Sequence, residues 1–226
     1  MKRMNRSVSL FLALILILST ATICLAIMPS DSFVAVKQGS SQCGPASFYM
    51  IFNHYHDQGI YTKANGTTTV DLSAVLTQVT SSTAICKYIN NGSTSGTTWT
   101  QLANAANGLY KNGLKYYNCE LNDVFTEYND TAGETERQIR FNRIYTQYLL
   151  NNRPVMIHIR RIWPYSGHYV VVTGYNPQTQ TVYYADPYDA TNKNVSYDSF
   201  IKNKWYVSSA SPANGRWDGE WMGFYH

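Results

Sequence analysis

Hydrophobic residues follow two different periods along the chain, a helical one first and a strand-like one in the last third. Leu72, Val75, Leu76 and Val79 recur at the i, i+3, i+4, i+7 spacing of one helix face. From residue 154 onward, short runs rich in β-branched residues replace this spacing, as is typical of strands. Helices that precede an antiparallel sheet predict an α+β fold.

The same patterns set the expected boundaries of the other elements. Helices are expected at 43–55, 71–79, 98–113 and 134–150, with a short one around Phe200. Strands are expected at 33–36, 114–119, 155–159, 168–175, 181–185 and 217–225. Thr98 and Gln101 are three residues apart, which fits a capping box at the start of the third helix. No internal repeat is recognisable, so we expect one domain over residues 27–226.

Residues 1–26 differ from the rest of the chain. Three basic residues precede an apolar run over residues 8–26, which is the pattern of a secretory signal peptide. Small residues at the −3 and −1 positions fit cleavage after Ala26. The alternative is an uncleaved membrane anchor, because the run is nearly long enough to span a bilayer. Either way, we expect a secreted or extracytoplasmic domain.

The composition agrees with export and argues against nucleic acid as a partner. Charged residues make up 14% of the 226 residues, and the net charge of +4 is not gathered in any basic run beyond the first residues. The 19 tyrosines, with many Asn, Ser and Thr residues, indicate an uncharged polar surface. We expect a monomer.

Cys43 follows a Gly/Ser/Gln-rich loop and precedes Gly44 and Pro45. Proline is favoured in the first turn of a helix, so Cys43 is expected at or just before a helix N-terminus. The free N–H groups and the helix dipole favour a thiolate there, and the thiolate is the nucleophilic form. A buried structural cysteine is the alternative, but a polar, glycine-rich approach favours a partly exposed thiol.

The remaining cysteines have a different expected role. Cys24 would leave with the signal peptide, and an exported location allows Cys86 and Cys119 to form a disulfide. Two buried free thiols are the alternative.

The hairpin formed by 168–175 and 181–185 brings a histidine toward a carboxylate. If the loop has five residues, Val170 lies opposite Asp186, and His168 becomes a diagonal neighbour of Asp186 on the same face. A one-residue change of register would separate the two side chains, and Asp189 could then replace Asp186.

Cysteine, histidine and aspartate are the nucleophile, base and orienting group of thiol acyl-transfer chemistry. His168 would take the thiol proton, and Asp186 would fix the imidazole tautomer. Gln38 could donate a side-chain N–H to the oxyanion, beside the backbone N–H of Cys43.

No metal or organic cofactor is implied by the sequence. His54 and His56 do not share a helix face, and no further Cys/His cluster completes a metal site, so both are expected to face solvent. His158 lies on an expected strand and is interpreted as structural.

Five motifs, taken in their order along the chain, resemble the C39-like peptidases of the papain-like superfamily. They lie at 38–47, 96–99, 153–155, 167–175 and 185–188. The resemblance implies a papain-like fold, in which an N-terminal helical part packs on a C-terminal antiparallel sheet. It also implies Cys43 as nucleophile, His168 as base, Asp186 as third member and Gln38 as oxyanion donor.

The resemblance implies a cysteine peptidase that acts on a peptide or protein substrate. Family members commonly place the oxyanion glutamine six residues before the cysteine, whereas Gln38 is five residues before Cys43. Two other functions stay open: an acyl or γ-glutamyl transferase with the same triad, and a non-catalytic surface-binding module on the same fold.

Overall fold

The structure is a computed structural model. It describes residues 33–57, 89, 96–111, 118–121, 130–161, 167–202, 204–207 and 215–225. The expected signal peptide, the expected helix at 71–79 and Cys86 of the expected disulfide lie outside the described residues. Within these ranges, none of the helices has the length and hydropathy that a membrane span requires.

A six-stranded antiparallel sheet forms the centre of the fold, with strand order β1-β6-β2-β3-β4-β5. Its strands are β1 (Asn118–Leu121), β2 (Val155–Arg161), β3 (Gly167–Asn176), β4 (Thr181–Asp186), β5 (Thr191–Ser196) and β6 (Gly215–Tyr225). The last strand in sequence lies between β1 and β2, in the interior of the sheet.

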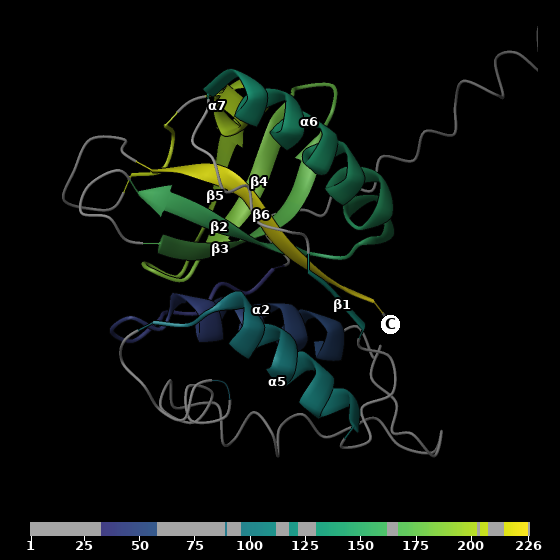
Figure 1. The fold of residues 1–226 in the computed structure, drawn as a ribbon, viewed down its shortest axis with the longest axis vertical. Coiled ribbons are helices and arrows are strands. Elements are labelled where there is room, and N and C mark those ends of the chain that lie inside the picture. The colour runs from purple at the N-terminus through teal and green to yellow at the C-terminus, as the bar shows by residue number, and fades with distance from the viewer. Residues whose placement is uncertain are drawn as a thin grey trace, which may run out of the picture.

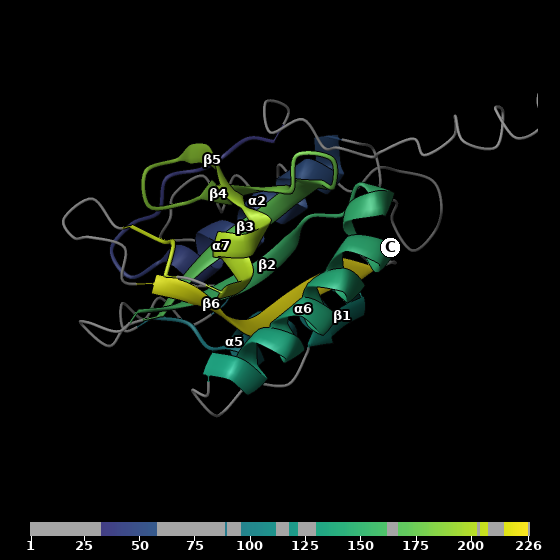
Figure 2. The same cartoon turned by 90° about the horizontal axis from the view of Figure 1, so that it is seen from above.

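Helices cover both faces of this sheet (Figures 1 and 2). Helices α2 (Cys43–Asp57) and α5 (Trp99–Lys111) lie on one face, and α6 (Asp130–Gln147) and α7 (Tyr197–Lys202) lie on the other. A 3₁₀ turn, η2 (Leu149–Asn151), follows α6. The α+β expectation is therefore confirmed, with the added feature that the second face has its own helical layer.

The alternation of side chains along the strands divides the interior into two cores. On β3, Tyr169 and Val171 face the α2 side, whereas Val170 and Val172 face the α6 side. Phe48 and Phe52 of α2 stack on each other with ring centroids 4.2 Å apart, and both contact Phe224 of β6. Burial of these aromatic rings fixes α2 against the sheet.

Two helix starts follow the local sequence signals closely. The first turn of α2 begins at Cys43, and the N–H of Ala46 donates to the carbonyl of Gln42 over 3.0 Å. At α5, the Thr98 N–H donates to Gln101 Oε1 over 2.8 Å, and the Gln101 N–H donates back to Thr98 Oγ1 over 3.3 Å. This reciprocal pair is the expected capping box.

The β3–β4 hairpin has the expected pairing at its far end, although its loop length and register differ from those expected. Asn176 pairs with Thr181, so the loop has four residues rather than five. A bulge at Thr173 then shifts the register by one residue, and Val171 lies opposite Ala185. Continued by one residue, this register places Val170 opposite Asp186, as the sequence predicts.

One expected edge strand is absent, and one edge strand was not expected. Residues 34–39 are irregular instead of forming a strand at 33–36, because their contacts are isolated hydrogen bonds rather than a ladder. The Asn192 side chain donates to the Phe33 carbonyl over 2.8 Å, and the Gln38 N–H donates to the Pro187 carbonyl over 2.7 Å. Conversely, β5 was not expected, because its polar sequence lacks an apolar alternation.

Candidate active site

Cys43 lies at the first residue of α2 and is partly exposed. The helix is tied to β3 by the Ser47 hydroxyl, which donates to the Tyr169 carbonyl over 3.2 Å. Close approach is possible because residue 44 is glycine: a Cβ there would lie 3.0 Å from the Thr97 Cβ and 3.3 Å from the Tyr169 ring. The thiol is therefore held at a helix N-terminus that packs tightly on the strand bearing His168.

His168 and Asp186 form a buried imidazole–carboxylate pair. The His168 Nε2 lies 2.8 Å from Asp186 Oδ1, and both side chains are almost fully buried. Oδ1 also accepts the Tyr188 N–H over 3.0 Å. Because the carboxylate accepts the proton on Nε2, the other ring nitrogen, Nδ1, is left for a partner on the opposite side of the ring.

The Cys43 thiol is the group that acts on this imidazole, because hydrogen bonding and charge between Cys43 and His168 shift the pKa of both groups. His168 is the second residue of β3, at the end of the sheet where α2 begins. The imidazole thus interacts with the sulfur as well as with the carboxylate, to which it is hydrogen-bonded. The three residues that the sequence singles out for nucleophile, base and orienting group are brought together.

The electrostatics of these three groups favour a thiolate beside an imidazolium. Burial alone would raise the pKa of the Cys43 thiol, but hydrogen bonding and attraction from His168, with help from the Tyr169 and Gly44 backbone, bring it below its ordinary value. Burial alone would lower the pKa of His168, but Asp186 and Cys43 raise it instead. Each group stabilises the charged form of the other.

Lys193 completes the surroundings of Asp186 and was not singled out by the sequence. Its ammonium group lies 2.9 Å from Asp186 Oδ2 and 2.7 Å from Asp189 Oδ2. Burial would raise the pKa of Asp186, but His168, Lys193 and the Tyr188 N–H lower it far below its usual range. The only available signal was a lysine in a polar segment that forms an edge strand.

Asp189, the alternative orienting residue, does not contact His168 in the structure. Its carboxylate is exposed and binds Lys193, so Asp186 holds the position opposite the imidazole.

Gln38 lies in the irregular segment that leads to α2, beside the turn that follows Asp186. Its backbone is anchored by the hydrogen bond to Pro187, and its Oε1 is buried without a hydrogen-bond partner among the described residues. Gln42 Oε1 is likewise buried without a hydrogen-bond partner among the described residues. The role of Gln38 as oxyanion donor therefore stays a prediction.

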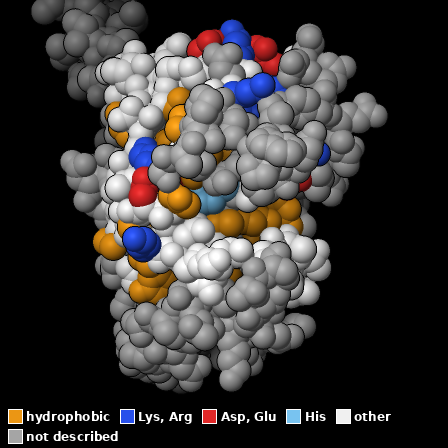
Figure 3. All heavy atoms as spheres, turned by 90° about the vertical axis from the view of Figure 1, so that its left-hand side faces the viewer, with side chains coloured by type: hydrophobic (Ala, Val, Ile, Leu, Met, Phe, Trp, Pro, Cys, Tyr) orange, Lys and Arg blue, Asp and Glu red, His pale blue; other side chains and the backbone are white. Residues whose placement is uncertain are grey.

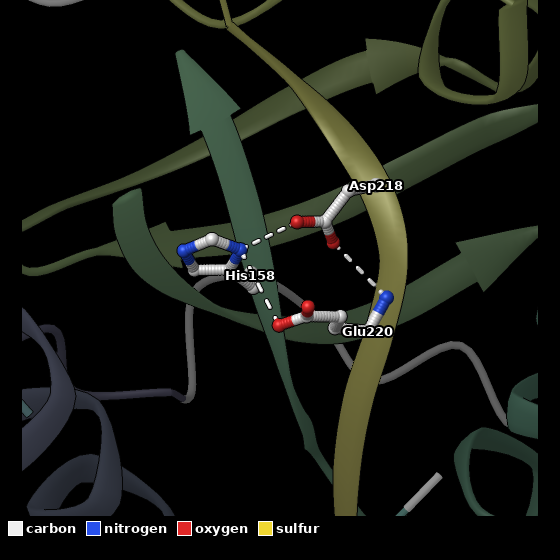
Figure 4. Close-up of side chains that lie close together, drawn as sticks. All are labelled: His158, Asp218 and Glu220. Atoms are coloured by element: carbon white, nitrogen blue, oxygen red, sulfur yellow. Dashed lines mark hydrogen bonds and ion pairs between the residues drawn. The ribbon is translucent and has the colours of Figure 1, made fainter. Parts of the chain in front are cut away.

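A second imidazole–carboxylate pair lies on the α2 side of the sheet (Figure 4). His158 Nδ1 is 2.5 Å from Asp218 Oδ2 and 3.5 Å from Glu220 Oε2. Burial would lower the pKa of His158, but the two carboxylates raise it. From the sequence, His158 is interpreted as structural. Neither acidic residue is singled out there, because the partners are about 60 residues apart on different strands.

The expectation that His54 faces solvent is wrong. Its side chain is buried in the α2 layer, and its ring centroid lies 5.3 Å from that of Phe33. The helix face that bears His54 is covered by the segment before α2, which the periodicity of α2 alone does not reveal.

One face of the molecule combines histidine with hydrophobic side chains. Figure 3 shows a histidine side chain reaching the surface beside a band of hydrophobic residues. Among the residues near Cys43, Trp99 packs edge-on against Tyr169 with ring centroids 4.8 Å apart, and the Tyr169 hydroxyl donates to the Thr97 carbonyl. Aromatic walls of this kind are typical of sites that bind extended or apolar ligands.

The order of elements, a cysteine-bearing helix followed by an antiparallel sheet with histidine and aspartate, is that of a papain-like fold. A model of the Peptidase C39-like family matches residues 31–211, and the chain belongs to this family. Comparison with curated proteins finds no match.

Proposed function

We propose that the protein is a cysteine peptidase that hydrolyses peptide bonds through Cys43, His168 and Asp186. One observation carries this proposal: the buried hydrogen bond between His168 and Asp186, with the Cys43 thiol at a helix N-terminus acting on the same imidazole. Membership of a C39-like peptidase family supports the reaction class.

In the first half of the reaction, the Cys43 thiolate attacks the carbonyl carbon of the scissile bond. The carbonyl oxygen becomes an oxyanion, which the Cys43 backbone N–H and the Gln38 side chain would stabilise. The His168 imidazolium then gives its proton to the leaving amine as the C–N bond breaks. The product is an amine and a thioester on Cys43.

In the second half, water attacks the thioester carbonyl. The neutral imidazole of His168 takes a proton from the water, the C–S bond breaks, and the carboxylic acid product leaves. Cleavage of the C–S bond leaves the Cys43 thiolate beside the protonated His168, which restores the starting thiolate–imidazolium pair. Asp186 stays ionised throughout, because His168 and Lys193 hold its pKa low, and it keeps the ring oriented.

An amine could replace water as the acyl acceptor without any change to these groups, which would make the protein an acyl or γ-glutamyl transferase. We favour water because the family is one of peptidases. Mass spectrometry of the products, with and without an added amine, separates the two outcomes.

We also propose that residues 1–26 direct export and that the domain acts as a monomer on peptide or protein substrates outside the cytoplasm. The basic and apolar pattern of residues 1–26 supports export. N-terminal sequencing of the protein after expression tests whether cleavage follows Ala26 or the segment is retained as an anchor.

The direct test of catalysis is labelling by a peptide probe with an acyl-trapping, thiol-reactive end at neutral pH. We expect rapid labelling, mapped by mass spectrometry to Cys43 and slowed by roughly 10²-fold or more in His168→Ala. Cys43→Ser should lose labelling and turnover while keeping its far-ultraviolet circular dichroism. A slow reaction at Cys43 that His168→Ala leaves unchanged would indicate a non-catalytic binding module.

A further inference from the structure

We propose that His158, Asp218 and Glu220 form a binding site for one Zn²⁺ ion. These residues are the one group of three side chains, among those that the structure describes, with ligand atoms placed to hold a metal ion, all within 4.8 Å of one another. The proposal is separate from the proposed peptidase activity, since none of the three belongs to the Cys43–His168–Asp186 group.

A bulge in β6 brings the two carboxylates to one histidine. Ile157 pairs with Trp221 and Ile159 pairs with Trp217, so three residues of β6, 218–220, lie opposite His158 alone. Gly219 in the middle has φ +99°, a conformation that suits glycine. In a regular ladder, residues 218 and 220 would lie opposite different residues of β2. This bulge instead turns Asp218 and Glu220 toward the same ring (Figure 4).

The orientation of His158 is set by the neighbouring strand. A Cβ on Gly167 would lie only 2.0 Å from His158 Nε2, so the ring occupies space that only a glycine leaves open. With Nε2 against the β3 backbone, Nδ1 points at both carboxylates. A fixed imidazole with one nitrogen aimed at carboxylate oxygens is a preformed part of a metal ligand set.

The separations suit a small tetrahedral ion. Zn²⁺ bonds of about 2.0–2.1 Å place neighbouring tetrahedral ligands roughly 3.3 Å apart. The Nδ1 to Glu220 Oε2 distance is 3.5 Å, and the Nδ1 to Asp218 Oδ2 distance is 2.5 Å. The ion would replace the proton that His158 and Asp218 share and move these atoms apart by less than 1 Å, roughly the difference between those spacings.

Both carboxylates are already oriented by outer hydrogen bonds, as metal ligands commonly are. The Trp99 indole N–H donates to Glu220 Oε2. The Glu220 backbone N–H donates to Asp218 Oδ1 over 3.0 Å, which leaves Oδ2 for the ion. These contacts come from α5 and from the bulge itself, so the ligand positions do not depend on the ion alone.

Charge also favours a dication here. Neutral His158 with ionised Asp218 and Glu220 carries two negative charges, which one Zn²⁺ balances. Calcium and magnesium prefer six or more oxygen ligands, whereas one imidazole and two carboxylates suit Zn²⁺.

The test is calorimetric titration of Zn²⁺ into the full chain carrying Cys43→Ala, which removes the thiolate as a competing ligand. We expect one ion bound per chain. His158→Gln in this background should weaken that binding by about 10- to 100-fold, and Asp218→Asn should do the same. Calcium titrated in the same way should not compete.

His168→Gln in the same background is the matched control, because it alters the other imidazole–carboxylate pair and should leave Zn²⁺ affinity unchanged. Circular dichroism checks that each variant is folded, and Glu220→Gln provides a third ligand variant if one fails to fold. The proposal is overturned if Zn²⁺ does not bind, if His158→Gln binds it as tightly, or if affinity falls only with His168→Gln. None of these outcomes depends on peptidase activity.

Discussion

Two imidazole–carboxylate pairs lie on neighbouring strands and on opposite faces of one sheet. His168 on β3 pairs with Asp186 over 2.8 Å, and His158 on β2 pairs with Asp218 over 2.5 Å. The third group differs: a lysine ammonium completes the first pair and a second carboxylate completes the other. The same two residue types therefore support different chemistry, because their third neighbour and their access to Cys43 differ.

At the His168 pair, Lys193 shares the carboxylate of Asp186 and leaves the imidazole free to exchange a proton with sulfur. At the His158 pair, Glu220 adds negative charge that attracts a cation. A histidine–aspartate pair is thus not sufficient to identify a catalytic base. The effect of His168 on Cys43, whose pKa it lowers, distinguishes His168 as the candidate.

The largest expected effect comes from replacing each imidazole in turn. His168→Ala should reduce kcat/KM for a peptide substrate by roughly 10³-fold, because both proton transfers are lost. His158→Ala should reduce it by less than about tenfold, because that ring makes no hydrogen bond to Cys43. Steady-state kinetics on folded variants measures both, and equal losses would contradict the division of roles.

The carboxylates provide the next contrast. Asp186→Asn should lower kcat/KM by roughly 10²-fold, less than His168→Ala, because the imidazole loses its orienting anion but stays in place. Asp218→Asn should stay within about tenfold of the wild type. A larger loss in Asp218→Asn than in Asp186→Asn would mean that the second pair, and not the first, serves the reaction.

The hairpin that carries the first pair shows how far the sequence predicts the site. The expected pairing of Val170 with Asp186 was reached, although the loop is one residue shorter, because the bulge at Thr173 compensates. Strand alternation predicts a face, but bulges depend on tertiary packing and are not visible in the pattern. The start of α2 at Cys43 was predictable because Gly44 and Pro45 act locally.

The pair of His158 and Asp218 was not predictable because it, too, depends on a bulge. Asp218, Gly219 and Glu220 read as part of an ordinary strand, and only the bulge in β6 turns both acids toward His158. Lys193 was missed because a polar edge strand has no hydrophobic period. Contacts set by one residue's neighbours in sequence were predictable, whereas contacts set by register between distant strands were not.

A smaller effect is expected from filling the space beside His158. Gly167→Ala should destabilise the protein by about 2 kcal/mol, because the new methyl group overlaps the ring. Urea unfolding measures this cost. In a double-mutant cycle, the same substitution in a His158→Ala background should cost less, since the smaller side chain leaves room. Equal costs in both backgrounds would show that the ring is not what occupies that space.

The smallest expected effect concerns the third neighbours. Activity should fall at alkaline pH as His168, whose pKa is raised, loses the proton needed by the leaving amine. Lys193→Gln should move this limb to higher pH, because Asp186 then acts on His168 without a competing cation. Glu220→Gln, on the other face, should leave the limb in place. If the alkaline limb of activity moved only with Glu220→Gln, it would report on His158 and not on His168.

The most direct test of the central claim is a pH titration of Cys43 ionisation, followed by thiolate ultraviolet absorbance as the difference from Cys43→Ser. In the wild type, the pKa should lie below that of an ordinary thiol, because hydrogen bonding and charge from His168 outweigh burial. In His168→Ala it should rise sharply, because burial is then opposed only weakly, and His158→Ala should move it far less. An unchanged pKa in His168→Ala would contradict the claim that His168 holds the sulfur ionised.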